Sequence, residues 1–223
     1  MFKRFSICYI LLMFCITGTS AQEDRWTGNA TNLSKGNLRV NSSGRYLEYS
    51  DGTPFLYIGD TAWELISRLN DKETELYLEN RREKGFTVIQ TVILDELDDM
   101  DVSSNGEPKL IDGNIDKPAP GYFTHVDKVI SLAAAKGLYI ALLPTWGDKV
   151  DKQWGKGPEI FTPENAYRYG KWLGERYMNA SNLIWIIGGD RSGDGKNFAI
   201  WNALATGIKS VDKNHLMTYH PHG

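Results

Sequence analysis

Short apolar segments alternate with helical patterns along most of this 223-residue chain, and this alternation limits the possible folds more than any other feature. The expected strands are residues 55–58, 88–93, 139–143, 183–187 and 216–219, and the expected helices are about 71–84, 122–136, 163–177 and 199–211. Apolar strands separated by helices predict a parallel sheet that is covered on both faces. The chain is therefore expected to form an α/β fold, either a doubly wound open sheet or a (β/α)8 barrel.

Residues that typically begin and end helices stand at the borders of these patterns. Asn70 precedes the first expected helix, and Glu73 three residues later completes the sequence of a capping box. Gly85 and Gly137 each follow a helical pattern, where glycine commonly ends a helix. Residues 38–49 come before the first apolar strand and contain a turn sequence between two short apolar segments, so they are expected to form a small hairpin.

The ends of the expected strands carry polar and aromatic side chains. Asp60, Gln90, Trp146, Asp190 and His220 each lie in or just after a different strand. This repetition favours the barrel, because every loop after a strand then lines one pocket, whereas an open sheet concentrates its ligand groups at a switch point. A complete barrel has eight strands and eight helices, and only about five strands and four helices are found here. We therefore expect the first part of a (β/α)8 TIM barrel, continued by chain beyond residue 223.

The N-terminal residues 1–21 have the layout of a signal peptide, with a basic pair, an apolar stretch and small residues before the expected cleavage site. The apolar stretch is shorter than the roughly 20 residues of a spanning helix, so a secreted or periplasmic protein without a membrane span is expected. Both cysteines lie in this leader, which leaves the mature chain without a disulfide. The polar residues 22–36 are expected to form a linker, and residues 37–223 the barrel part.

Several function classes are disfavoured by the sequence. The formal net charge of −3 gives no reason to expect a nucleic-acid partner. The chain contains no Gly-x-Gly-x-x-Gly or Walker pattern for phosphate binding and no Gly-x-Ser-x-Gly elbow of an α/β-hydrolase. The segment that begins at Asp190 resembles a calcium loop, but Trp201 occupies the position that needs a glutamate, and the acidic residues 95–101 are interpreted as a solvated loop. We therefore expect neither a cofactor nor a metal ion.

Asp190 is the best-placed candidate for a catalytic carboxylate. The apolar strand 183–187 leads to it through two glycines, which allow a tight bend and a close approach by a ligand. We expect Trp185 to lie beside it, where desolvation disfavours the charged carboxylate, as a general acid requires. The alternative is a structural role, in which Asp190 caps the next segment or pairs with Arg191.

Two loops after strands combine tryptophan with charged side chains. This combination suits a sugar, whose C–H face stacks on a flat ring and whose hydroxyls need hydrogen-bond partners. The first loop holds Asp60, Trp63 and Glu64, and the second holds Trp146, Asp148 and Lys149. Packing of the tryptophans between helix and sheet is the alternative. A sugar-binding pocket at the strand ends is therefore expected.

Five segments resemble, in order and spacing, the apiosidase-like glycoside hydrolases: GDTAWEL (59–65), KGFTVIQ (84–90), LLPTWGDKV (142–150), IWIIGGD (184–190) and TYHP (218–221). The resemblance implies hydrolysis of glycosidic bonds to apiose in the pectic polysaccharide rhamnogalacturonan II, by a retaining mechanism with two carboxylates. It assigns one catalytic carboxylate to Asp190, while the second, a glutamate, is expected on a late strand beyond residue 223. The residues expected around the sugar are Asp60, Trp63, Glu64, Gln90, Trp146, Asp148, Lys149 and His220.

Other functions stay open at this point. A barrel that binds carbohydrate without catalysis, or a barrel glycosidase with another sugar specificity, would share most of these features. A sugar-phosphate enzyme would place its phosphate loops after the seventh and eighth strands. Because the second carboxylate and part of the barrel are expected beyond residue 223, we expect the 223-residue chain by itself to be inactive.

Overall fold

The computed structural model describes residues 28–96 and 102–222. The expected signal peptide, residues 1–21, lies outside these residues, as do the first part of the expected linker and part of the acidic run. Among the helices described, none is both long enough and apolar enough to cross a membrane.

Residues 28–36, the described part of the expected linker, lie against the end of a barrel helix. The Ala30 amide donates to the Lys136 carbonyl at 2.9 Å, and the Thr31 hydroxyl donates to the Gly137 carbonyl at 2.5 Å. This segment is therefore attached to the barrel by hydrogen bonds before the first strand begins.

A parallel sheet of five strands forms the centre of the fold. In the order in which they lie side by side, its strands are β4 (Gly59–Thr61), β5 (Val88–Leu94), β6 (Tyr139–Thr145), β7 (Leu183–Gly188) and β8 (Met217–His220). This is also the chain order, without the reversal that defines the switch point of a doubly wound sheet. The sheet therefore has the arrangement of the first five strands of a (β/α)8 barrel, and the expected fold class is confirmed.

The described α-helices are α1 (Leu65–Arg68), α2 (Asp71–Glu83), α3 (Pro120–Ala135), α4 (Pro163–Tyr177) and α5 (Phe198–Val211), and single 3-10 turns lie at Leu33–Lys35, Ile111–Gly113, Gly147–Lys149 and Gly195–Asn197. Helices α2 to α5 agree with the expected ones to within two residues at each end. The capping box is present, because the Asn70 side chain accepts from the Glu73 amide at 3.2 Å and the Glu73 carboxylate accepts from the Asn70 amide at 3.0 Å. Helix α3 begins earlier than expected, since Pro120 occupies its first turn. The sequence patterns did not reveal α1.

A small antiparallel sheet precedes the barrel strands and contains β1 (Leu38–Val40), β2 (Leu47–Tyr49) and β3 (Pro54–Phe55). The expected hairpin is therefore confirmed and extended by a third strand. The prediction of the first barrel strand at residues 55–58 is wrong, because Phe55 pairs with Leu47 in the small sheet and barrel pairing begins at Gly59. The apolar segment between them does not form a buried strand, since Leu56 is 69% exposed.

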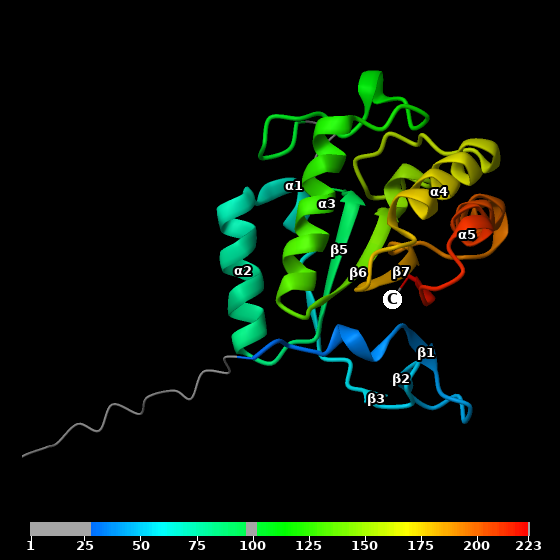
Figure 1. Ribbon diagram of the computed structural model, residues 1–223. Coiled ribbons are helices and arrows are strands. Elements are labelled where there is room, and N and C mark those ends of the chain that lie inside the picture. The colour runs from blue at the N-terminus through cyan, green and yellow to red at the C-terminus, as the bar shows by residue number, and fades with distance from the viewer. Residues whose placement is uncertain (1–27, 97–101, 223) are drawn as a thin grey trace, which may run out of the picture.

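Side chains alternate between the two faces of the parallel sheet. Ile89 belongs to the outer core, together with apolar side chains of the helices, whereas Val88 belongs to the inner core. The inner core also contains Phe55 of the small sheet, whose ring lies 5.2 Å from that of Tyr139 at the start of β6. The small sheet therefore covers the inner core at the N-terminal ends of the strands, at the bottom of Figure 1. The opposite, C-terminal ends carry the loops of the candidate site.

Candidate active site

The backbone bends sharply where β7 ends. Gly188, Gly189 and Asp190 have φ angles of 105°, 126° and 55°, all in the left-handed region. A Cβ atom at Gly188 would lie 2.4 Å from the His220 carbonyl oxygen, and one at Gly189 would lie 2.7 Å from the Gly147 amide nitrogen, so there is no room for a side chain at either position. Asp190 does carry a side chain, and its left-handed backbone is therefore strained, as is common at functional sites.

The Asp190 carboxylate lies beside His220 and is open to solvent. Its Oδ1 atom is 3.3 Å from Nδ1 of His220, and the side chain is 43% exposed. The guanidinium of Arg191 is bonded instead to main-chain carbonyls, those of Asp151, Lys152 and Asp190, at 2.5, 2.8 and 2.9 Å. Nδ1 of His220 also accepts a hydrogen bond from the Asp190 amide at 3.4 Å, so the histidine contacts both the backbone and the carboxylate of Asp190. The alternative of a side-chain pair with Arg191 is not the arrangement found.

Trp185 does not lie beside Asp190, and that expectation is wrong. Trp185 belongs to the outer core of β7, where its indole N–H donates to Oδ2 of Asp212 at 2.7 Å. The strand alternates strictly at this point, with Ile184 and Ile186 on the inner face. The period of two therefore directs the Trp185 ring toward the helices, and the expected desolvation of Asp190 by this ring is not found, since the Asp190 side chain is 43% exposed.

Three aromatic side chains from different strand ends meet next to Asp190. Trp63 follows β4, Trp146 follows β6, and His220 ends β8. The Trp63 ring centroid lies 5.1 Å from that of Trp146 and 5.3 Å from that of His220, and the other two are 5.6 Å apart. The Trp146 indole nitrogen is buried and has no hydrogen-bond partner in the described part of the chain. A ligand hydroxyl could satisfy this donor, whose burial without a partner is otherwise costly.

Glu96, in the loop after β5, is a candidate that the sequence reasoning missed by treating it as part of a solvated acidic loop. A recess of about 120 Å³ is lined by Trp63, Glu64, Val92, Asp95, Glu96 and Trp146. Burial raises the pKa of the Glu96 carboxyl, the negative charges of Asp148 and Asp190 raise it further, and the cations Arg191 and Lys149 oppose that increase. A carboxyl group of this kind in a recess is a candidate acid or hydrogen-bond donor. Its place two residues after the buried strand β5 was the signal that could have identified it.

Asp148 and Lys149 are fully buried and hold a neighbouring loop. The Lys149 ammonium donates to Oδ2 of Asp148 at 3.0 Å and to the Gly157 carbonyl at 2.5 Å, and the Gly157 amide donates to the same carboxylate oxygen at 2.8 Å. This loop passes close to Glu96, since a Cβ atom at Gly155 would lie 3.1 Å from its Oε1. The pair therefore positions the loop that encloses Glu96.

The remaining expected site residues differ in their placement. Glu64 lines the recess, and Gln90 lies half-buried on the inner face of β5. The structure separates Asp60 from this group, because its carboxylate accepts from the Tyr77 hydroxyl at 2.7 Å and pairs with Arg81, both on α2. Asp60 therefore joins the sheet to a helix on the outer side of the barrel.

The described residues contain no group of three or more His, Cys, Asp or Glu side chains that is arranged to hold a metal. His220 and His222, which are close in sequence, have different neighbours: His220 lies beside Asp190, and the His222 ring lies 5.3 Å from that of Trp154.

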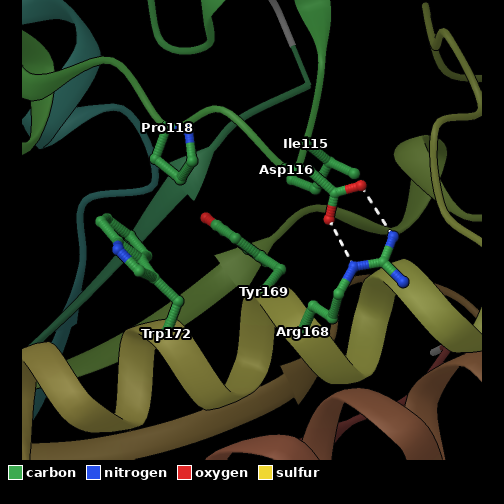
Figure 2. Close-up of a pocket in the computed structure, with 6 residues that line it drawn as sticks. All are labelled: Ile115, Asp116, Pro118, Arg168, Tyr169 and Trp172. Carbon is green, nitrogen blue, oxygen red and sulfur yellow. Dashed lines mark hydrogen bonds and ion pairs between the residues drawn. The ribbon is translucent and has the colours of Figure 1, made fainter.

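A second recess, of about 680 Å³, lies outside the sheet between α4 and the loop before α3 (Figure 2). It is lined by Ile115, Asp116, Pro118, Arg168, Tyr169 and Trp172. Its two charged side chains bind each other, because the Arg168 guanidinium donates to both Asp116 carboxylate oxygens at 2.8 and 2.7 Å. The Asp116 carboxylate in this recess is therefore already paired, whereas the Asp190 carboxylate at the strand ends is open to solvent. We place the candidate site at the strand ends for this reason.

Parallel strands in chain order, with an exposed carboxylate and aromatic rings at their C-terminal ends, are the arrangement in which (β/α)8-barrel enzymes place their active sites. The chain belongs to the apiosidase-like family, because residues 41–223 match the family described as "Apiosidase-like, catalytic domain". No curated protein matches the chain at a significant level.

Solved structures of glycoside hydrolases are similar to this chain. One, described as "Glycoside hydrolase", is 42% identical with a TM-score of 0.77, over 86% of this chain and 42% of that protein. A glycoside hydrolase family 5 protein from Bacteroides vulgatus ATCC 8482 is 35% identical with a TM-score of 0.77, over 87% of this chain and 41% of that protein. The catalytic domain of Thermobifida fusca endoglucanase Cel5A, with 14% identity, a TM-score of 0.54 and coverage of 86% of this chain and 57% of that one, shares the fold. The chain thus spans less than half the length of the first two proteins.

Proposed function

We propose that this protein is a secreted or periplasmic hydrolase that cleaves glycosidic bonds to apiose in the pectic polysaccharide rhamnogalacturonan II. The observation that carries the proposal is the Asp190 carboxylate, which stands open to solvent at the end of β7 beside His220. Membership of the apiosidase-like family supports the sugar, and the signal-peptide layout of residues 1–21 supports the location.

Asp190 acts as the general acid in this proposal. Its carboxyl proton passes to the glycosidic oxygen as the bond to the anomeric carbon breaks, so the leaving group departs as a neutral alcohol. A glutamate, which the family resemblance assigns to a later barrel strand, attacks the anomeric carbon and forms a glycosyl ester. Asp190, now ionised, then takes a proton from the water that hydrolyses this ester. Configuration is retained over the two displacements.

The aromatic group next to Asp190 binds the sugar. Trp63, which is half-buried, presents ring surface, and Trp146, which is 5% exposed, contributes the unpaired indole N–H. Nδ1 of His220 contacts the acid. The oxygens of Glu64 and Glu96 accept hydrogen bonds from hydroxyl groups in the recess, and Glu96 also donates one when it is protonated.

Three of the expected residues support this pocket from outside it. Asp148 and Lys149 hold the loop beside Glu96, and Asp60 anchors β4 to α2. Gln90 lies on the inner face of β5. A sugar that extends below the recess reaches its side chain.

The experiment is to express the complete reading frame as wild type and as Asp190→Asn and to measure apiose release from pectic side chains. We expect the substitution to slow release by about 10²- to 10⁴-fold, the usual contribution of a general acid. Asp194→Asn makes the same chemical change at an exposed position in the same loop, and we expect it to leave the rate within about twofold. Undiminished release by Asp190→Asn would remove Asp190 from the mechanism.

We expect the 223 residues by themselves to be inactive, because the family resemblance assigns the second carboxylate of the mechanism to a later barrel strand. In the described sheet β4 and β8 are the edge strands, and unpaired edges favour association between chains. Apiose release by the isolated 223-residue chain would contradict this expectation.

A further inference from the structure

Arg191, the residue after the candidate acid, is a fully buried cation that binds main-chain oxygens. Its guanidinium donates to the carbonyls of Asp151, Lys152 and Asp190 at 2.5, 2.8 and 2.9 Å, and among the described residues it forms no ion pair. All of these groups belong to the described residues, and the guanidinium is already buried among them. The arrangement therefore does not depend on what packs against the exposed surfaces.

Stability alone gives a weak reason for a charge at this position. Burial of a charged group is costly unless an opposite charge balances it, and bonds to neutral carbonyls offset that cost only in part. The cation lies where the backbone is strained, since Asp190 has a φ of 55°. Such a conformation persists only when the surrounding structure holds it in place. The bond from Arg191 to the Asp190 carbonyl provides one such constraint.

The segment around Asp190 is held from both neighbouring strands through the same residue. On the β8 side, the Tyr219 hydroxyl donates to the Arg191 carbonyl at 2.9 Å. On the β6 side, the Arg191 guanidinium reaches the loop after the strand, at Asp151 and Lys152. The side chain of an aspartate is short, so the position of its backbone largely sets the position of its carboxylate. A displacement of about 1 Å in a catalytic group can cost about 100-fold in rate.

The charge of Arg191 also acts on the carboxylates of the site. Burial raises the pKa of Glu96, and the negative charges of Asp148 and Asp190 raise it further, whereas the positive charge of Arg191 opposes this increase. The guanidinium therefore balances negative charge in addition to binding the backbone.

We propose that Arg191 is a positioning residue for the general acid. Its guanidinium joins the left-handed Asp190 backbone to the loop after β6, and this link sets where the Asp190 carboxylate stands relative to the oxygen of the leaving group. The inference rests on the proposed glycosidase function, in which Asp190 protonates that oxygen.

The test compares two substrates in the protein expressed from the complete reading frame. A nitrophenyl apioside has a leaving group that departs with little help from an acid, whereas a pectic oligosaccharide with a bond to apiose releases an alcohol and needs the proton. We expect Arg191→Lys to lower kcat/KM by about 10- to 100-fold for the oligosaccharide and by less than about threefold for the nitrophenyl apioside. Lysine keeps the charge, but its ammonium group lacks the planar fork that binds several carbonyls at once.

Two further variants control for a loss of folding. Arg82→Lys makes the same change at an arginine that is 7% exposed in the last turn of α2 and donates to the Gly28 carbonyl, and we expect both rates to stay within about twofold. Tyr219→Phe removes only the hydroxyl that binds the Arg191 carbonyl. We expect it to show the same preference at a smaller size, with a loss of about two- to fivefold for the oligosaccharide alone. This variant decides the test if Arg191→Lys does not fold.

The outcomes separate the inference from the proposed function. Equal losses for both substrates would show that Arg191 supports the structure in general, and no loss for either would show that the acid does not need it, so each result would overturn the inference. Asp190→Asn should itself impair the oligosaccharide more than the nitrophenyl apioside. If it does not, or if the wild-type protein cleaves neither substrate, the proposed function fails and the inference fails with it.

Discussion

Nδ1 of His220 lies 3.3 Å from Oδ1 of Asp190, and this contact joins the ends of β8 and β7 at the point where the Trp63 and Trp146 rings meet the same imidazole. The histidine therefore has two kinds of contact: its ring packs against Trp63 and Trp146, and its Nδ1 atom contacts the candidate acid. The same Nδ1 atom also accepts a hydrogen bond from the Asp190 amide at 3.4 Å, so His220 contacts both the backbone and the carboxylate of Asp190.

Replacing His220 should impair catalysis more than folding. We expect His220→Leu to lower kcat/KM for glycoside hydrolysis by about 10- to 100-fold, because Asp190 loses the contacts of its amide and its carboxylate with Nδ1. His220→Asn keeps a polar atom near the position of Nδ1 and should retain more activity. The melting temperature is measured in parallel, and a loss of activity that only follows a loss of stability would argue against a positioning role.

Gly189 should tolerate no side chain. We expect Gly189→Ala to lower the free energy of unfolding by about 3 kcal/mol or more, since the added Cβ meets the Gly147 amide in addition to the cost of a left-handed backbone. Gly85→Ala is the matched control, because Gly85 also has a positive φ but a Cβ there meets nothing within 4 Å. Its expected cost is about 1–2 kcal/mol. Urea unfolding of both variants makes the comparison, and equal costs would contradict the close approach at Gly189.

Glu96→Gln should stabilise the protein and impair its activity. Burial and nearby negative charges raise the pKa of Glu96 in the folded state, so its ionisation at neutral pH lowers the free energy of unfolding. Glutamine carries no charge and avoids this loss. The difference between variant and wild type should be present at pH 7 and disappear below the usual carboxyl pKa of 4.5, where Glu96 is protonated in both the folded and unfolded states. Activity should fall about tenfold or more through loss of a charged hydrogen-bond acceptor. Thermal unfolding of both proteins from pH 3 to 8 measures this difference in stability. A Glu96→Gln variant that is less stable than wild type at pH 7 would contradict the prediction.

Asp212 should make the fold sensitive to acid. Burial alone would raise its pKa, but hydrogen bonds from His215 and Trp185 outweigh burial and hold the pKa well below the usual 3.8. A lowered pKa in the folded state means that the stabilisation is complete above about pH 4 and is lost as the pH falls further.

We expect Asp212→Asn to lower the free energy of unfolding at pH 7 by about 3–5 kcal/mol, because it leaves the buried His215 without its carboxylate partner. The variant should also lose less stability than wild type on acidification. Urea unfolding at pH 7, 5 and 3 provides the measurement. Parallel losses in the two proteins between pH 5 and 3 would rule out Asp212 as the source of acid sensitivity.

Local patterns predicted the helices well because the residues that begin and end them act within one turn. Asn70 occupies the expected N-cap position of α2, and α4 begins at the expected residue, Pro163. The first barrel strand was misplaced for the opposite reason, since residues 55–58 are apolar but strand pairing depends on distant partners. Phe55 pairs with Leu47 in the small sheet, whereas Gly59 pairs with Val88 in the barrel sheet.

The sequence by itself determined the α/β class, the parallel strands in chain order and the position of Asp190 after a buried strand, because hydrophobic periodicity and the glycine pair are local properties. Only the tertiary structure decided which side chains share the site. It directed Trp185 and Asp60 to the outer side of the sheet and placed Glu96 in the recess with Trp146. The physical reason is that the face on which a strand residue lies, and the partners it meets there, depend on register and on loops from other strands, which no single segment encodes.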